Sequence, residues 1–101
     1  MSFNGLRLEH DLDGSSNYIA WKDRMEAVLD DNGLNEFIDA EIPKPTSSDA
    51  AALDAWKKKT TKCRRILLEG VKDHIVYNLH GKASPFLMWK ALTDLFQRRS
   101  D

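Results

Sequence analysis

The stretch that decides the fold is Asn17 to Leu29, which reads NYIAWKDRMEAVL. On a helix that turns about 100° per residue, its apolar side chains fall within an arc of about 100°, and most of its charged side chains fall outside that arc. The apolar residues on this arc are Tyr18, Trp21, Met25, Val28 and Leu29. Two interpretations are open, a ligand-binding aromatic cage and the core-facing side of an amphipathic helix, and the spacing favours the helix.

The ends of this first helix also have sequence signals. Ser15, Ser16 and Asn17 are all residue types that cap helix N-termini, because each side chain can accept a hydrogen bond from an unpaired first-turn N–H. Gly33 predicts the end of the helix, since glycine adopts the left-handed conformation without a Cβ clash. Residues 34–38 have apolar side chains spaced for one more short helical turn.

A second long helix is predicted after Pro43 and Pro45, which break the chain because proline fixes φ and lacks an N–H donor. Thr46, Ser47 or Ser48 is expected to cap it. Apolar and small residues recur along it at alternating spacings of 3 and 4, at Leu53, Trp56, Thr60, Cys63 and Leu67. Gly70 predicts its end.

Two further helical segments follow. Val71, Ile75 and Leu79 recur every fourth residue before Gly81, another expected helix end. Ser84 and Pro85 have the pattern of a helix start, a serine cap followed by proline at the first helical position. The apolar face of this last helix contains Phe86, Trp89, Leu92, Leu95 and Phe96, with Met88 widening it. The fold class is therefore all-α, a compact bundle of four to five helices.

The side chains on these apolar faces form the predicted core. Its signature residues are Tyr18, Trp21, Met25, Leu29, Trp56, Cys63, Leu67, Trp89, Leu92 and Phe96. Because Trp21, Trp56 and Trp89 lie on three different helices, we expect the three indoles to converge in one interior.

The composition sets the class of protein. The chain has 101 residues, enough for one domain, and its 42% hydrophobic and 31% charged residues are typical of a soluble globular protein. A formal net charge of −1 gives no overall attraction to nucleic acid or to an anionic membrane, and no apolar run is long enough to cross a bilayer. A single cysteine, Cys63, excludes an internal disulfide and favours a reducing, intracellular setting.

Catalytic and metal-binding patterns are absent from the sequence. His10, His74 and His80 lack the spacing of a metal site, and Cys63 lies on an apolar stripe, where a cysteine usually packs as a small hydrophobe. No glycine-rich phosphate loop is present. We therefore expect no enzyme and no cofactor.

Positive charge is concentrated on the second long helix, at Lys57, Lys58, Lys59, Lys62, Arg64 and Arg65. One hypothesis is a weak RNA contact through phosphates, with Lys58, Lys62 and Arg65 as the candidates. The alternative is a solvated helix face, partly neutralised by Asp54 four residues before Lys58. The sequence favours the solvated face, since no aromatic side chain is interleaved there to stack on bases.

The order of these signals resembles a known family. The order is the segment LDGSSNYIAWKDRMEAVL at 12–29, then Trp56, then Ile66-Leu67, then the run from Ala83 through Trp89-Lys90-Ala91-Leu92 to Phe96. This order is similar to that in the Gag proteins of copia-type retrotransposons. The resemblance covers about residues 6–98.

The resemblance implies a fold like the N-terminal lobe of a retroviral capsid and a structural role. Copies of such proteins associate in a virus-like particle, in the cytoplasm, that packages the element's RNA. We assign residues 1–14 to an N-terminal arm, 15–98 to the helical capsid-like domain and 99–101 to a C-terminal tail. Family members usually continue into a second helical lobe and often a CCHC zinc knuckle, so we expect this chain to be truncated at its tail and to contact RNA mainly through those downstream regions.

The expected partner is a second copy of the chain, and the candidate self-association residues are Val76, Tyr77, Leu87 and Met88. The alternative function is a domesticated Gag-derived scaffold that binds a host peptide in a groove between helices. A helix-turn-helix DNA-binding protein is disfavoured, because the last helix begins with Pro85, Phe86 and Leu87 instead of base-reading side chains. No membrane partner is expected.

Overall fold

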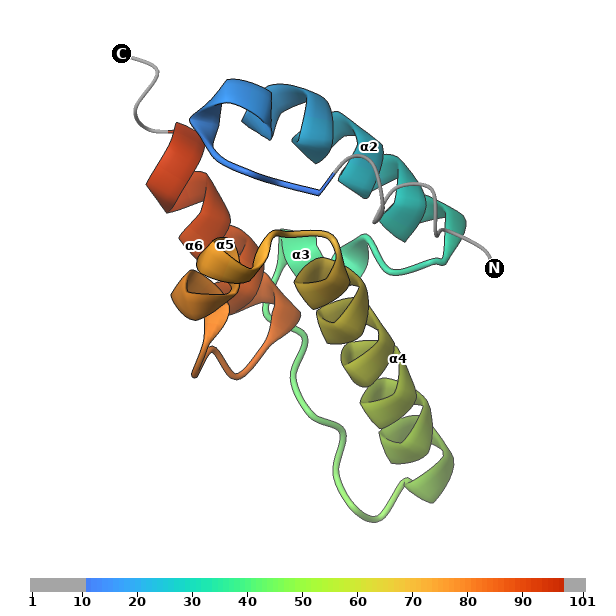
Figure 1. Ribbon diagram of the computed structural model, residues 1–101. Coiled ribbons are helices and arrows are strands. Elements are labelled where there is room, and N and C mark those ends of the chain that lie inside the picture. Colours follow the sequence, from blue (N-terminus) through green and yellow to red (C-terminus); the bar gives the residue numbers. More distant parts are fainter. Residues whose placement is uncertain (1–10, 98–101) are drawn as a thin grey trace.

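The computed structural model describes residues 11–97, which form a bundle of α-helices (Figure 1). The elements are η1 (Ser15–Asn17, a 3-10 helix), α2 (Tyr18–Asp31), α3 (Glu36–Asp39), α4 (Ala50–Glu69), α5 (Asp73–Leu79) and α6 (Pro85–Phe96). The all-α fold class predicted from the sequence is confirmed. The tail at 99–101, most of the N-terminal arm and His10 lie outside the described residues.

Helix α2 has the orientation that its periodicity predicts. Tyr18, Trp21, Met25 and Leu29 are all buried and face the other helices. The helix ends where expected, with Gly33 at a φ of 69° immediately afterwards, a left-handed conformation that a Cβ would disfavour.

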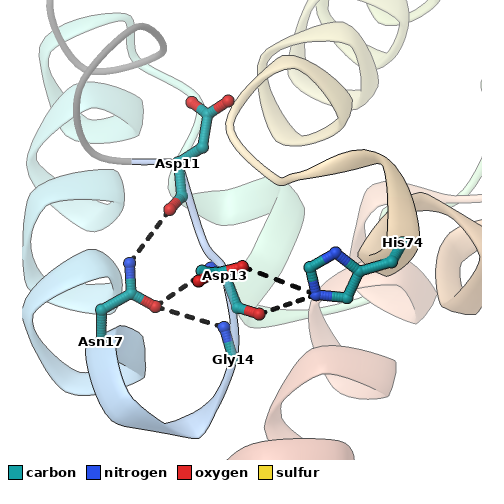
Figure 2. A network of polar contacts seen from close by, with 5 residues as sticks. All are labelled: Asp11, Asp13, Gly14, Asn17 and His74. Carbon is teal, nitrogen blue, oxygen red and sulfur yellow. Dashed lines mark hydrogen bonds and ion pairs between the residues drawn. The ribbon is translucent and has the colours of Figure 1, made fainter.

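The start of α2 differs from the prediction of a side-chain cap. Asn17 stands at the N-cap position, but its side chain makes no cap hydrogen bond. Its Oδ1 instead accepts from the backbone N–H groups of Asp13 and Gly14 at 3.0 and 3.3 Å, and its Nδ2 donates to the carbonyl of Asp11 at 3.0 Å (Figure 2). The two serines before Asn17 lie within η1 and do not cap α2 either. Asn17 therefore stabilises the turn that leads into the helix.

The segment before this turn belongs to the folded unit. Leu12 is fully buried and forms an isolated parallel β-bridge with Val71. Its N–H donates to the Gly70 carbonyl and its carbonyl accepts from the Lys72 N–H, both at 2.9 Å. A single bridge has no alternating pattern, so periodicity could not predict it. The bridge ties the chain before α2 to the turn between α4 and α5.

The N-cap of α4 is Asp49, whose Oδ1 accepts from the Ala52 N–H at 3.1 Å. The prediction that Thr46, Ser47 or Ser48 caps this helix is wrong. The hydroxyls of Thr46 and Ser48 lie 2.9 Å apart and hydrogen-bond to each other. Aspartate is as good a cap as serine, so residue type alone did not separate these positions.

Burial divides α4 into two halves. Its buried residues are Cys63, Ile66 and Leu67, all in the C-terminal half. The N-terminal half projects beyond the other helices, beside the loop that precedes it (Figure 1). Residues 50–62 include none that is fully buried, so this half contributes little to the core.

The last two helices complete the bundle. Gly81 follows α5 with a φ of 83°, and α6 begins as predicted, with the Ser84 hydroxyl accepting from the Leu87 N–H at 3.2 Å and Pro85 at the first position. Helix α6 packs against α3, α4 and α5. This matches the breadth of its apolar face, which includes Met88.

Candidate functional site

The aromatic side chains of α2 and α6 form a closed stack. The ring centroids of Trp21 and Trp89 lie 5.6 Å apart, those of Tyr18 and Trp21 6.3 Å, and those of Tyr18 and Phe96 5.6 Å. Offset stacking at these separations is favourable beyond the burial of area. The rings contact each other and leave no gap between them for a ligand, so the opening stretch forms core and not an aromatic cage.

Two polar atoms of this stack hydrogen-bond within the protein. The indole Nε1 of Trp21 donates to the Gly70 carbonyl at 2.6 Å, and the Tyr18 hydroxyl donates to Gln97 Oε1 at 3.1 Å. A Cβ at Gly70 would lie 2.5 Å from Met25 Cε. A side chain at this position would displace the flexible end of Met25, and the Gly70 carbonyl anchors the indole that organises the core.

Burial raises the pKa of both ionisable core side chains. The pKa of Tyr18 rises from 10.0 to about 12, mainly because burial disfavours the phenolate and also because Glu26 is negatively charged. The pKa of the Cys63 thiol rises from 9.0 to about 12 because of burial. A reactive cysteine needs the thiolate, so Cys63 acts as a packed apolar group and not as a nucleophile.

Trp56 lies in a different setting from the other two tryptophans. It is half-buried at the edge of the core, and its Nε1 donates to the Ile42 carbonyl at 3.1 Å. The prediction that all three indoles converge is therefore wrong for Trp56. The N-terminal half of α4 places it at the edge of the core, where the loop before α4 covers part of it.

A groove of about 270 Å³ opens beside Trp56. Its walls come from the end of α3, the following loop, α4 and the start of α6, and include Phe37, Ile42, Pro43, Trp56, Thr60 and Phe86. At its rim, the Ser84 hydroxyl donates to Glu41 Oε1 at 2.8 Å. The groove is mainly apolar, and its ionisable lining residues are Glu41 and Lys44.

The basic side chains of α4 lie on its solvent side. Lys57, Lys58, Lys62 and Arg65 surround a shallow, open depression together with Thr61. This brings together the three residues proposed to contact RNA, and all four basic side chains are exposed. Lys58 is paired with Asp54 at 3.2 Å, as the spacing predicts.

The residues proposed for self-association fall in three different environments. Tyr77 is 81% exposed and Leu87 is 38% exposed, whereas Val76 is partly buried against the core. Met88 is only 1% exposed, so its assignment to a surface is wrong. It points into the bundle because α6 packs against three helices.

One exposed apolar residue was missed by the sequence analysis. Ile19, on α2, is 63% exposed. Its position outside the apolar arc of α2 was visible in the sequence, but an isolated exposed isoleucine is common on protein surfaces. Ile19 is a candidate contact residue because it lies on the solvent side of the helix that organises the core.

Metal-binding groups do not cluster in the part of the chain that the structure describes. Within it, no group of three or more His, Cys, Asp or Glu side chains is placed to hold a metal ion. His74 Nε2 donates to the Asp13 carbonyl at 2.7 Å (Figure 2), which links α5 to the turn before α2. No helix within residues 11–97 is long and apolar enough to span a bilayer.

Comparisons with known proteins identify the family. A family model described as the gag-polypeptide of LTR copia-type matches residues 25–101. A search of curated proteins and a search of solved structures each found no match. The matched segment contains the second half of α2 and all of α3 to α6. The chain therefore belongs to the copia-type family of LTR-retrotransposon gag-polypeptides.

Proposed function

We propose that this chain is a structural Gag domain that self-associates in a virus-like particle, in the cytoplasm, enclosing the RNA of the element. The observation that carries the proposal is the family match over residues 25–101. The site geometry supports a structural role, because the buried ionisable groups are held neutral and the groove beside Trp56 is mainly apolar.

The exposed apolar side chains support repeated weak contacts. Ile19, Tyr77 and Leu87 are the large exposed apolar side chains of the described residues, and they lie on α2, α5 and α6. Contacts between different surfaces of identical subunits close into rings or extend into lattices. A particle needs this kind of contact.

Sedimentation velocity over a wide concentration range tests this proposal. We expect concentration-dependent association, weakened at least about tenfold by Tyr77→Ser, since a large aromatic side chain contributes much of the energy of a small contact. Asn78→Ser, at the neighbouring exposed position on α5, is the matched control and should associate like the wild type. A strict monomer at high concentration, for this chain and for a longer Gag polypeptide that contains it, would overturn the proposal.

A second candidate function is a scaffold that binds a peptide. The groove beside Trp56 supports it, because a half-buried indole with apolar neighbours can accept an apolar peptide side chain. Peptides selected by display against the chain would separate the two functions. Binding that is lost in Trp56→Ala, kept in Tyr77→Ser and accompanied by no particle formation would select the scaffold.

A further inference from the structure

Charge is divided sharply along this nearly neutral chain. Residues 23–41 contain a single cation, Arg24, against the carboxylates of Asp23, Glu26, Asp30, Asp31, Glu36, Asp39 and Glu41. Residues 57–65 contain no carboxylate and carry Lys57, Lys58, Lys59, Lys62, Arg64 and Arg65. The formal net charge of −1 therefore conceals an acidic region, α2 with α3, and a basic region on α4.

The acidic region presents unpaired carboxylates to solvent. We call the exposed group Asp23, Asp30, Asp31, Glu36 and Asp39 the acidic face. None of these five forms an ion pair or a side-chain hydrogen bond with the residues that the structure describes. The two other carboxylates of this region are engaged, Glu26 with Lys22 at 3.1 Å and Glu41 with Ser84.

An exposed apolar side chain borders the acidic face. Ile19, Asp23 and Asp30 follow one another along α2 at spacings of four and seven residues, which places them on one stripe of the helix. Ile19 is 63% exposed. The acidic face therefore combines repeated negative charge with an apolar side chain that a partner could cover.

The basic region has the complementary character. Lys57, Lys58, Lys62 and Arg65, which we call the basic face, line one side of α4. Only Lys58 has an ion-pair partner among the described residues, and that partner is Asp54 on the same helix. Helix α4 runs away from α2 (Figure 1), and no ion pair within residues 11–97 joins the two helices. Within residues 11–97, the two faces therefore do not neutralise each other.

We propose that the basic face of one copy docks on the acidic face of a second copy. The contact is head-to-tail, so each copy keeps one face free for the next, and such a contact closes into a ring or extends into a lattice. The inference rests on the proposed function and deepens it by naming the two surfaces that meet. The apolar side chain of Ile19 lies next to the contact and adds buried area.

A second copy fits these observations better than RNA does. Phosphates would neutralise the basic face, but they would be repelled by the acidic face and would leave its five carboxylates unpaired. A second copy neutralises both faces at once. Since exposed ion pairs are individually weak and screened by salt, the contact should be reversible and strongly dependent on ionic strength.

The test uses charge reversal in the complete chain. One variant reverses the basic face through Lys58→Glu, Lys62→Glu and Arg65→Glu. The other reverses the acidic face through Asp23→Lys, Asp30→Lys and Asp31→Lys. A matched control carries three reversals at exposed lysines outside both faces, Lys44→Glu, Lys72→Glu and Lys82→Glu. Circular dichroism verifies that each variant is folded, and nuclease treatment removes bound RNA before sedimentation velocity.

Association of the wild type should weaken at least about tenfold when salt rises from about 50 to about 500 mM, because the screening length falls several-fold. Each face variant alone should lose association, whereas the control should keep it. An equimolar mixture of the two face variants should recover it, since every acidic surface then meets a basic one. The control carries the same formal charge as the basic-face variant, so the difference between these two variants distinguishes a specific contact from a general effect of net charge.

Three results would overturn the inference. Association that is independent of salt and unchanged in both face variants would place the contact elsewhere and leave the proposed Gag function standing. Association that disappears after nuclease treatment, with no recovery in the mixture, would assign the basic face to RNA. A mixture that stays monomeric while the wild type associates would also reject the pairing. A wild type that stays monomeric throughout, alone and within a longer Gag polypeptide, would contradict the proposed function itself.

Discussion

The two halves of α4 carry the same sequence pattern and have different surroundings. In the C-terminal half, Cys63, Ile66 and Leu67 are buried in the core. In the N-terminal half, Leu53 and Trp56 continue the apolar stripe but are only partly covered. Periodicity therefore indicates which side of a helix is apolar, whereas the neighbouring elements decide how much of that side is covered.

The indoles of Trp21 and Trp56 show the same difference on the scale of one side chain. Both donate Nε1–H to a backbone carbonyl, at 2.6 Å to Gly70 and at 3.1 Å to Ile42. Trp21 is enclosed by aromatic rings and by Met25, whereas Trp56 forms one wall of an open groove. Trp21 therefore stabilises the whole fold, and Trp56 fastens the projecting half of α4 to the loop before it.

Trp21→Ala should have the largest effect. Emptying a fully enclosed indole site costs about 3–5 kcal/mol, a large part of the total stability of a domain of this size. Chemical denaturation should show a nearly unfolded variant. Trp21→Phe is the control, because it keeps much of the ring volume and loses only the hydrogen bond to Gly70. A loss below about 1 kcal/mol for Trp21→Ala would contradict the central place given to this side chain.

Alkaline pH should have the second-largest effect, a decrease in the free energy of unfolding. The pKa of Tyr18 rises from 10.0 and that of Cys63 from 9.0, each to about 12. In this range the folded state keeps protons that the unfolded state releases, so stability falls as pH rises above about 9, by about 1 kcal/mol per pH unit for each group that titrates. Below about pH 9, the contribution of these two protonated groups to the free energy of unfolding is fully present.

Urea denaturation between about pH 8 and about pH 11 measures this effect, since the free energy of unfolding tracks the difference in bound protons. Tyr18→Phe should flatten the decline above about pH 10, because it removes one of the two titrating groups. A free energy of unfolding that stays constant over the whole range would contradict the burial of both side chains.

Trp56→Ala should have an intermediate effect. The indole is only half-buried, so we expect a loss of about 1–2 kcal/mol, well below that for Trp21→Ala. Denaturation experiments on both variants under the same conditions provide the comparison. Equal losses would show that Trp56 is as fully part of the core as Trp21.

Substitutions of the helix caps should cause the smallest losses of stability. Ser84→Ala removes the cap of α6, a core helix, and the hydrogen bond to Glu41, and should cost about 1 kcal/mol of global stability. Asp49→Ala removes the cap of the projecting half of α4 and should cost less in global unfolding, because that end can fray without opening the core. Thermal melts of the two variants should rank them in this order.

The sequence predicted the elements that depend on local signals. Gly33, Gly81 and the Ser84-Pro85 pair marked helix boundaries correctly, because backbone conformation and cap chemistry are properties of the residues themselves. The buried side of α2 was also predictable, since helical geometry fixes which side chains share a face.

Features that depend on distant contacts could not be predicted. The Leu12–Val71 bridge joins segments far apart in the chain and has no periodicity. Met88 lies at the edge of a broad apolar face, and only the packing of α6 against several helices decides that it is buried. The acidic and basic faces were partly visible in the sequence as charge runs. Their exposure and the absence of ion pairs between them within the described residues could be established only from the structure.

Amide hydrogen exchange along α4 tests the division of this helix most directly. At concentrations that keep the chain monomeric, amides between residues 54 and 61 should exchange at least about a hundredfold faster, relative to intrinsic rates, than those between 63 and 69, because the projecting half can open without disrupting the core. Equal protection along the whole helix would contradict this division.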